Sequence, residues 1–389
     1  MYLFLLFVIY LSFVGLGLPE SLLGSLWPIM RTEFSAPLDF AGVISLIFTV
    51  SKTLSGLVTD RIDRKLGHGK TSLLSMAVMS ASLFGCALSH SQYQICFFVL
   101  PLGLASGIID TAINDYVARN YSSKNMSWLH CSWGIGSMLS PFAIGFILSH
   151  GGSWRGGYTF VACIQAVITV LLILSLPRWK KTSGTGSNNS ESEQIRVLPL
   201  REVFRLPGIF PMLIAMFSYC AAEVTASLWA SSFLIEVRGF DAETAATCTS
   251  AVFIGITLGR FLCSFAADRL GDSRMALTGG AVAFSGAVIL TLSTGSFFSL
   301  AGLFIIGFGC GPVVPSLLHI SPSLYGRENS STVVGIEMAS AHLGSCVMPP
   351  LFGLIAEHIS IRLFPFYVAV FILLMLITII ISARQHKNS

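Results

Sequence analysis

Apolar stretches of about 20 residues, each long enough to cross a lipid bilayer as a helix, recur along nearly the whole chain. Hydrophobic residues make up 53% of the sequence and charged residues 11%, whereas soluble domains carry roughly 25% charged residues. So few charges cannot cover a globule of 389 residues. We therefore expect an all-α integral membrane protein with twelve transmembrane helices, at residues 2–28, 38–58, 71–89, 93–118, 126–149, 156–177, 209–235, 242–266, 275–294, 297–319, 331–356 and 363–383.

The basic residues are distributed unevenly between the two sets of predicted loops. Lys52 and Arg260 fall within spans, and most of the other basic residues lie on one side of the membrane. The opposite side keeps four of them, Arg31, Arg155, Arg238 and Arg362. Because cytoplasmic loops carry an excess of Lys and Arg, we expect a multi-pass protein of the inner (plasma) membrane with both termini cytoplasmic. The first stretch lacks a basic start and a cleavage site, so we interpret it as the first span and not as a signal peptide.

The two halves of the chain repeat each other. An Asp-Arg pair that begins at Asp60 returns at Asp268, and a Gly-Ser-x3-Pro-x3-Gly motif that begins at Gly136 returns at Gly344, both 208 residues later. Between the halves, residues 178–207 are polar and rich in Ser, Gly and Asn, which is typical of a flexible linker. The sequence thus predicts a bundle at 1–177, a cytoplasmic linker at 178–207 and a bundle at 208–389. Parallel six-helix repeats are a transporter architecture.

The segment G-L-V-T-D-R-I-D-R-K at residues 56–65 resembles the loop signature of the major facilitator superfamily, G-x-L-x-D-R-x-G-R-R/K. A weaker copy lies at 264–271, and the resemblance covers both halves, which implies two pseudo-symmetric six-helix bundles. In this family the Asp pairs with a neighbouring helix end and with basic partners, an arrangement that favours one packing of the bundles. The resemblance therefore implies a conformational latch. Its residues would be Asp60, Arg61, Arg64, Asp268 and Arg269. Asp63 stands where the family has Gly, and the alternative is a basic loop that only sets topology.

Ionisable residues inside spans are costly and usually functional, and the fourth span contains one. Its element I-D-T-A-I-N, with Asp110 and Asn114, resembles the L-E-T-A-x-N element of the fucose permease branch, with Asp in place of Glu. In that branch the acid takes part in sugar and proton binding, which implies the same role for Asp110. Asp110 and Asn114 are one helical turn apart and share a face. The alternative is that Asp110 only hydrogen-bonds a neighbouring helix.

The first and fifth spans supply further candidates for binding substrate or proton. Pro19 should distort the first helix and free a carbonyl group, which neighbouring helices or water can satisfy, and Glu20 should then face a central cavity. In the fifth span, His130 is of the residue type that exchanges a proton near neutral pH. Trp133 offers an aromatic face to a sugar ring. A helix-embedded His more often bonds a backbone carbonyl, and that interpretation of His130 stays open.

The second half offers Glu223, near the middle of the seventh span and followed by Trp229. We expect both to bind substrate or proton. In the eleventh span, Glu337 and His342 are five residues apart, about 140° around a helix, so they cannot both face one cavity. We take Glu337 as the cavity residue.

Taken together, these features predict a proton-coupled symporter of a small polar solute, such as a sugar or sugar derivative, that works by alternating access. Its expected partners are that solute and the lipid bilayer, with no nucleic acid, and we expect a functional monomer. No H-E-x-x-H, G-x-S-x-G or P-loop motif occurs and no C-x-x-C pair is present, so we expect neither an enzyme nor a metal or other cofactor. The alternative is a drug or metabolite efflux antiporter on the same fold.

Overall fold

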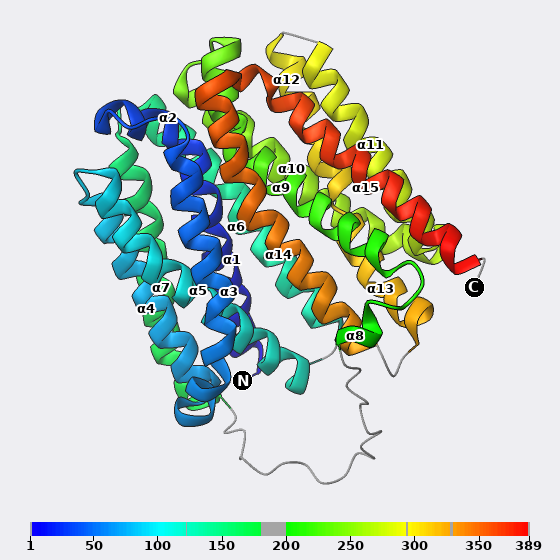
Figure 1. The fold of residues 1–389 in the computed structure, drawn as a ribbon. Helices are drawn as coiled ribbons and strands as arrows, with labels where there is room; N and C mark the ends of the chain where they lie inside the picture. Colours follow the sequence, from blue (N-terminus) through cyan, green and yellow to red (C-terminus); the bar gives the residue numbers. More distant parts are fainter. Residues whose placement is uncertain (1, 122, 180–199, 293–294, 327–329, 388–389) are drawn as a thin grey trace. The chain divides into compact units, whose positions relative to one another are not determined.

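The computed structural model describes residues 2–121, 123–179, 200–292, 295–326 and 330–387, and every regular element among them is helical (Figure 1). The chain divides into two compact units. Unit 1 comprises residues 1–186 together with 239–250, and unit 2 comprises residues 187–238 together with 251–389. Most of the predicted linker, residues 180–199, lies outside the described part of the chain. A short helix, α8 (Leu200–Val203), follows it.

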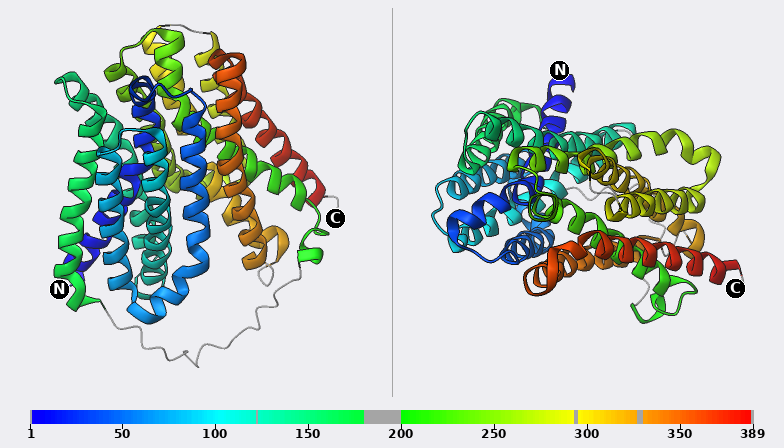
Figure 2. Two further views of the ribbon diagram at one scale, coloured as in Figure 1. Left: turned by 60° about the vertical axis from the view of Figure 1, so that its left-hand side comes forward. Right: turned by 90° about the horizontal axis from the view of Figure 1, so that it is seen from above.

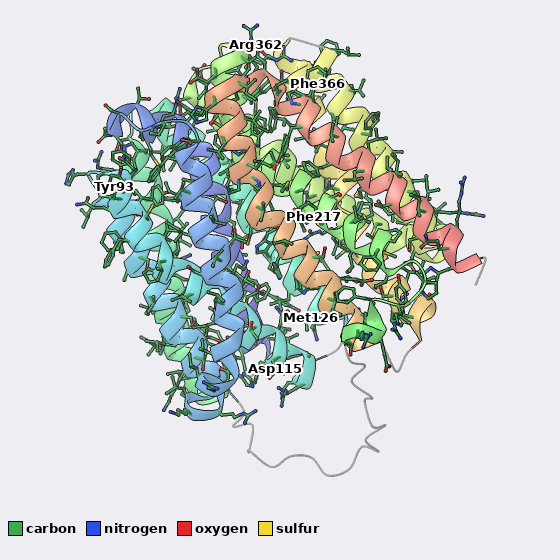
Figure 3. All side chains as sticks on the ribbon, viewed as in Figure 1. Tyr93, Asp115, Met126, Phe217, Arg362 and Phe366 are labelled. Atoms are coloured by element: carbon green, nitrogen blue, oxygen red, sulfur yellow. The ribbon has the colours of Figure 1, made fainter. Side chains whose placement is uncertain are left out.

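Six helical spans, counted over the described residues, run back and forth through unit 1. The N-terminus and the end of the sixth span lie at the same end of the bundle (Figure 2). The spans are α1 (Tyr2–Gly17) continued by η1 (Leu18–Ser21) and α2 (Leu22–Phe34), then α3 (Phe40–Leu66), α4 (His68–Ala87), α5 (Gln92–Asn120), α6 (Ser123–Ser149) and α7 (Trp154–Ser175), which ends in η2 (Leu176–Arg178). Tyr93 and Asp115, both on α5, lie near opposite ends of the unit (Figure 3).

The second half repeats this pattern over its described residues. Its spans are α9 (Ile209–Arg238), α10 (Ala242–Leu270), α11 (Asp272–Leu292), α12 (Ser296–Cys310) continued by α13 (Val313–Tyr325), α14 (Ser330–Ile355) and α15 (Phe364–Lys387). The first residues of α10 group with unit 1 and the rest of that helix with unit 2.

The helices confirm the predicted spans and show one difference from them, at the last two spans. Ten described segments are long and apolar enough to cross a membrane, and α3 contributes a shorter apolar helix, Phe40–Gly56. α3 itself continues to Leu66. The last two predicted spans form one run, Thr332–His386, because their connection is helical too, in η3 (Ala356–Ser360) and η4 (Ile361–Leu363).

Large apolar side chains lie exposed on the outside of both units. Phe97 on α5 and Phe146 on α6 are exposed in unit 1, as are Phe210 and Val370 in unit 2. On a protein in water such a surface would promote association. It suits helices whose solvent is the hydrocarbon of a bilayer.

Pro19 breaks the first span as the sequence predicted, and the chain supplies a replacement donor. A proline at position 19 has no N–H for the carbonyl of Gly15, four residues earlier. The helix tightens into the 3₁₀ turn η1 at this point, and the side-chain amide of Gln165 on α7 donates to the Gly15 carbonyl oxygen at 2.9 Å. Gln165 is completely buried. The corresponding helix of unit 2, α9, has no such proline and is continuous.

The first and fifth spans of each unit approach closely at the repeated glycine motif. In unit 1 the Cα of Gly136 on α6 lies against the backbone carbonyl of Val14, where a Cβ atom would clash. In unit 2 Gly344 on α14 lies in the same way against Phe217 on α9. Small residues permit such backbone contacts between membrane helices, and these contacts fix the helices that carry the charged groups described next.

Candidate functional site

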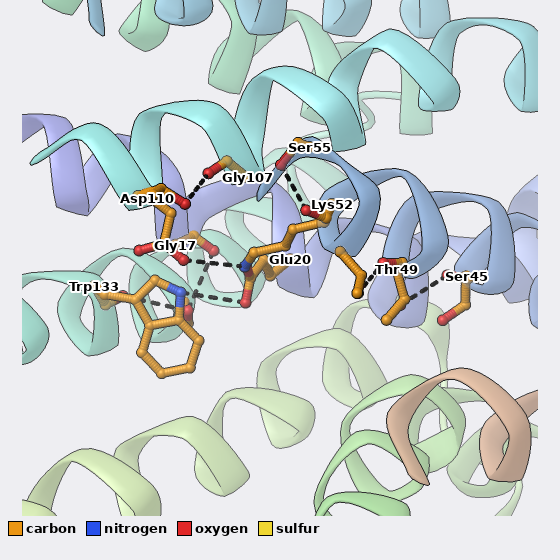
Figure 4. Close-up of polar contacts among 12 residues, drawn as sticks. Gly17, Glu20, Ser45, Thr49, Lys52, Ser55, Gly107, Asp110 and Trp133 are labelled. Atoms are coloured by element: carbon orange, nitrogen blue, oxygen red, sulfur yellow. Dashed lines mark hydrogen bonds and ion pairs between the residues drawn. The ribbon is translucent and has the colours of Figure 1, made fainter. Parts of the chain in front are cut away.

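Three charged side chains, Glu20, Lys52 and Asp110, form a cluster within unit 1 that we call the charged triad. The ammonium of Lys52 on α3 donates a hydrogen bond to Oε1 of Glu20 on η1. Its Nζ also lies 4.0 Å from Oδ2 of Asp110 on α5. Figure 4 shows Lys52 reaching from its helix toward both acids. The side chains are partly shielded, with 18% of Glu20, 25% of Lys52 and 34% of Asp110 exposed.

Each acid of the triad has a second polar neighbour. Trp133 on α6 donates from its indole Nε1 to Oε2 of Glu20 at 3.2 Å. Asn114 donates from Nδ2 to Oδ1 of Asp110 at 2.8 Å and also contacts the Asp110 carbonyl oxygen at 2.9 Å. The sequence therefore identified two members of the triad, Glu20 and Asp110, together with their neutral neighbours Asn114 and Trp133. The helices of unit 1 bring them together around Lys52.

Local sequence explains why these groups meet. The 3₁₀ turn that Pro19 imposes carries Glu20 out of α1, and Ser137 on α6 donates to the Gly17 carbonyl at 3.2 Å, which ties this turn to the helix of Trp133. On the other side, α5 packs directly on α3, because Gly107 lies against the carbonyl group of Lys52. The triad thus sits where η1, α3 and α5 meet.

The formal charge of the triad is uneven. Two carboxylates share a single ammonium, so the fully ionised cluster carries one net negative charge. An uncompensated charge within a membrane protein is expensive, and binding one proton to either acid removes it. Chemically, this arrangement places one uncompensated negative charge beside hydrogen-bonding groups suited to a polar ligand.

Unit 2 contains an acid–base pair in its own first and second helices. Oε1 of Glu223 on α9 lies 3.7 Å from Nη2 of Arg260 on α10, and the two side chains are 14% and 28% exposed. Buried Tyr219, one turn before Glu223, interacts electrostatically with both charges. Here one carboxylate meets one guanidinium, so the pair is neutral without a proton.

The two pairs occupy equivalent places in the repeat. Lys52 and Arg260 are 208 residues apart, the spacing of the repeated motifs. The first helices of the two units align with a spacing of 203 residues, because Phe217 takes the place of Val14 in the glycine contact described above. Glu20 and Glu223 are also 203 residues apart, so they occupy equivalent positions. Asp110 has no counterpart: the residue 208 positions later is Leu318.

Other predicted site residues lie apart from these pairs. Glu337 on α14 is fully buried, and both of its carboxylate oxygens contact the Ser321 hydroxyl, at 2.7 and 2.8 Å. Trp229 is also fully buried, and its indole donates to the Pro349 carbonyl at 2.9 Å, which is a helix-packing contact. The ring of His130 packs edge-on against Phe13, with the ring centroids 6.0 Å apart.

The latch prediction can be compared with the structure only in part. Arg61 and Arg64 lie near the end of α3, whereas the side chains of Asp60, Asp268 and Arg269 lie outside the described residues. Asp63, the departure from the family pattern, contacts His68 Nδ1 at 3.0 Å at the start of α4. The latch therefore stays a prediction.

Sequence reasoning missed three residues of the site and its support: Lys52, Arg260 and Gln165. The two cations were recognised as lying within spans but were not assigned to the site. Their shared spacing of 208 residues was a signal that could have identified them. Gln165 carried no comparable signal, because its partner is a backbone carbonyl on another helix.

Comparison with known proteins agrees with this architecture. The family model of the Major Facilitator Superfamily matches residues 6–249 and 239–389. A Saccharomyces cerevisiae protein named Bypass of stop codon protein 6 is 23% identical over 91% of this chain and 77% of its own length. The Bacillus subtilis glucose/mannose transporter GlcP is 23% identical over 88% of this chain and 86% of its own.

A solved structure of a mutant of the nucleoside transporter NupG matches with a TM-score of 0.78 at 13% identity, covering 98% of this chain and 99% of that one. At this identity the likeness shows the fold alone. The family match extends over nearly all of both halves. The chain therefore belongs to the Major Facilitator Superfamily and is a multi-pass membrane transporter, not an enzyme.

Proposed function

We propose that this protein is a proton-coupled symporter of a neutral polar solute, with a sugar or sugar derivative as the favoured substrate. The observation that carries the proposal is the charged triad of unit 1. Its two carboxylates share one ammonium, so the unit can lose its excess charge by binding one proton. A carrier that reorients only when its embedded charge is compensated would couple that proton to its substrate.

The pairing of the embedded cations favours a neutral substrate over an anionic one. Lys52 and Arg260 each already contact a carboxylate, so an anionic solute would have to displace a protein acid. The triad itself would repel a second negative charge. A polyol carries no charge and can exchange hydrogen bonds with the acids.

The groups around the triad suit a sugar. Asn114 and Trp133 both donate hydrogen bonds to the triad's acids, and a sugar hydroxyl can replace or extend such bonds. The indole ring of Trp133 also offers an apolar face to a pyranose ring. GlcP, one of the relatives, is named as a glucose/mannose transporter, which makes these two sugars the first substrates to test.

The transport cycle follows from these elements. The two units would alternate access to the substrate from either side of the inner membrane. Both termini would be cytoplasmic, and the protein would act as a monomer in the bilayer, with the solute and a proton as its ligands and no cofactor.

Reconstituted protein tests the proposal directly. Labelled glucose and mannose should accumulate in proteoliposomes under an inward proton gradient, and a protonophore should abolish the accumulation. Asp110→Asn should abolish gradient-driven accumulation and retain exchange of labelled for unlabelled sugar, because the amide cannot carry the proton. Accumulation that does not depend on the proton gradient would refute proton coupling. Efflux of drugs without any sugar uptake would instead support the exporter.

A further inference from the structure

We infer that Lys52 sets the number of protons that unit 1 binds: one proton when Lys52 is present and two when its charge is removed. This inference rests on the proposed function, since it counts the protons that a symporter would carry. It assigns a positioning role to a residue that does not itself gain or lose the proton.

The count begins with the geometry of the ammonium. Lys52 Nζ contacts Glu20 and lies 4.0 Å from Asp110, and an ammonium has three N–H donors for such contacts. Glu20 and, after it, Asp110 supply the carboxylate charges that act on Lys52. One cation therefore compensates one of the two acids, and a proton must compensate the other.

The remaining oxygens of the acids are held in place without adding charge. The Trp133 indole and the Asn114 amide are neutral donors, so they orient the carboxylates and leave the charge of the cluster unchanged. Because both acids share the same cation, the proton can bind to either carboxylate. Removing either acid leaves one carboxylate and one ammonium, so unit 1 should then bind no proton at the triad.

Several other ionisable groups lie on the elements that pack against the triad. Among them are Tyr10, which donates to Asn125; Glu33, which pairs with Arg155; and Asp115, which pairs with Arg119 and contacts His68. Arg31 on α2, Lys70 on α4 and His130 on α6 lie on these elements too, and α3 itself also carries Arg61, Asp63, Arg64 and Lys65. A measurement of the triad must therefore separate its carboxyl groups from the titration of these neighbours.

Unit 2 provides an internal comparison. Its pair, Glu223 and Arg260, stands in the same place in the repeat but lacks a second acid, because Leu318 replaces Asp110. One acid and one base require no proton. The difference between the units thus lies in one carboxyl group, and the proton count should follow the balance of acids and bases.

Infrared difference spectra of purified protein, recorded between mildly acidic and alkaline pH, count protonated carboxyl groups through their C=O stretch without any substrate. The triple variant K52M/E20Q/D110N, in which the triad is neutral, gives the baseline for all other ionisable groups. Relative to that baseline, the wild type and K52R should show one carboxyl equivalent. D110N and E20Q should each show none.

Two further variants make the test sharp. K52M should show two equivalents, and K52M/D110N should show one, although D110N alone shows none. K52M/D110N has the same formal charge as the wild-type triad, so the count can be tested even where K52M fails to fold. A purely structural role for Lys52 would not make the second substitution restore a proton.

The inference is overturned by a K52M/D110N spectrum that matches the neutral triple variant, or by a D110N spectrum that retains the full wild-type intensity. Because no sugar is present, this outcome is independent of substrate identity. Failure to transport glucose or mannose would count against the proposed function and leave the proton count standing.

Discussion

Gln165 should stabilise unit 1 chiefly by satisfying the carbonyl that Pro19 leaves without its helical partner. The side chain is completely buried, and its amide donates to the Gly15 oxygen at 2.9 Å. Gln165→Leu keeps a side chain of similar size and leaves that oxygen without its donor. A buried unsatisfied carbonyl costs about 1–3 kcal/mol. Gln165→Leu also removes the side-chain Oε1, which is buried without a hydrogen-bond partner among the described residues, so the net cost should lie near the lower end of that range. For a unit of this size, about 1 kcal/mol corresponds to a melting temperature lower by roughly 2–4 °C.

The chain offers both a rescue variant and a control. Pro19→Ala restores an N–H four residues after Gly15. The cost of Gln165→Leu in free energy of unfolding should therefore be about 1–2 kcal/mol smaller in the Pro19→Ala background than in the wild type. Gln385→Leu, at an exposed position, should change stability by less than about 0.5 kcal/mol. Thermal unfolding in detergent can be followed with a thiol-reactive dye, because Cys86 in unit 1 is fully buried. An equal cost of Gln165→Leu with Pro19 and with Ala at position 19 would refute the reasoning.

Other substitutions test the second charge pair, the glycine contact, a helix start and the topology. Arg260→Met should destabilise unit 2 by about 3 kcal/mol, because it leaves the shielded Glu223 carboxylate without its cation. In the same thermal melts, Arg260→Met/Glu223→Gln should recover most of that loss, and the control Arg274→Met, near the start of α11, should have little effect. Gly136→Ala should cost about 1–3 kcal/mol through its clash with the Val14 carbonyl, whereas Gly56→Ala, which meets open space, should be neutral or stabilising. At the start of α10, hydrogen bonds from Thr244 hold the pKa of Asp241 below its usual value. Asp241→Asn should therefore reduce the free energy of unfolding at neutral pH, and this difference from the wild type should disappear as the pH falls through that lowered pKa. A cysteine at Gly67, between α3 and α4, should react with a membrane-impermeant reagent only from the cytoplasmic side and one at Ser153 only from outside; labelling of both from one side would contradict the topology.

The spans could be predicted from the sequence because their signal is local. Each apolar run must be about as long as the bilayer is thick. The largest difference at a helix end is in α3, where polar turns extend the helix from the predicted residue 58 to Leu66. The acids Glu20 and Asp110 could be found for the same reason, since a charge inside an apolar run stands out. Their pairing with Lys52 could not. Periodicity fixes the face of one helix on which a side chain lies, but not which helix packs against that face.

Aromatic and isolated acidic residues show the same limit. Trp229 lies near Glu223 in the sequence as a ligand-binding tryptophan would, yet its indole is fully buried and bonded to the Pro349 carbonyl. Composition alone cannot distinguish the two roles, because both need a large apolar ring with one polar atom. Glu337 likewise looks like a cavity residue in its span, but its contacts with Ser321 lie between α13 and α14.

The repeat explains why the halves can share an arrangement and still differ in chemistry. Duplication places an acid on the first helix and a base on the second helix of each unit, and such a pair is neutral wherever it occurs. Asp110 disturbs this balance in unit 1 alone, at a position where unit 2 has Leu318. Exchanging these two residues therefore isolates the effect of one carboxyl group. Asp110→Leu should make unit 1 electrically balanced like unit 2, whereas Leu318→Asp gives unit 2 the second acid that, in unit 1, creates the need for a proton.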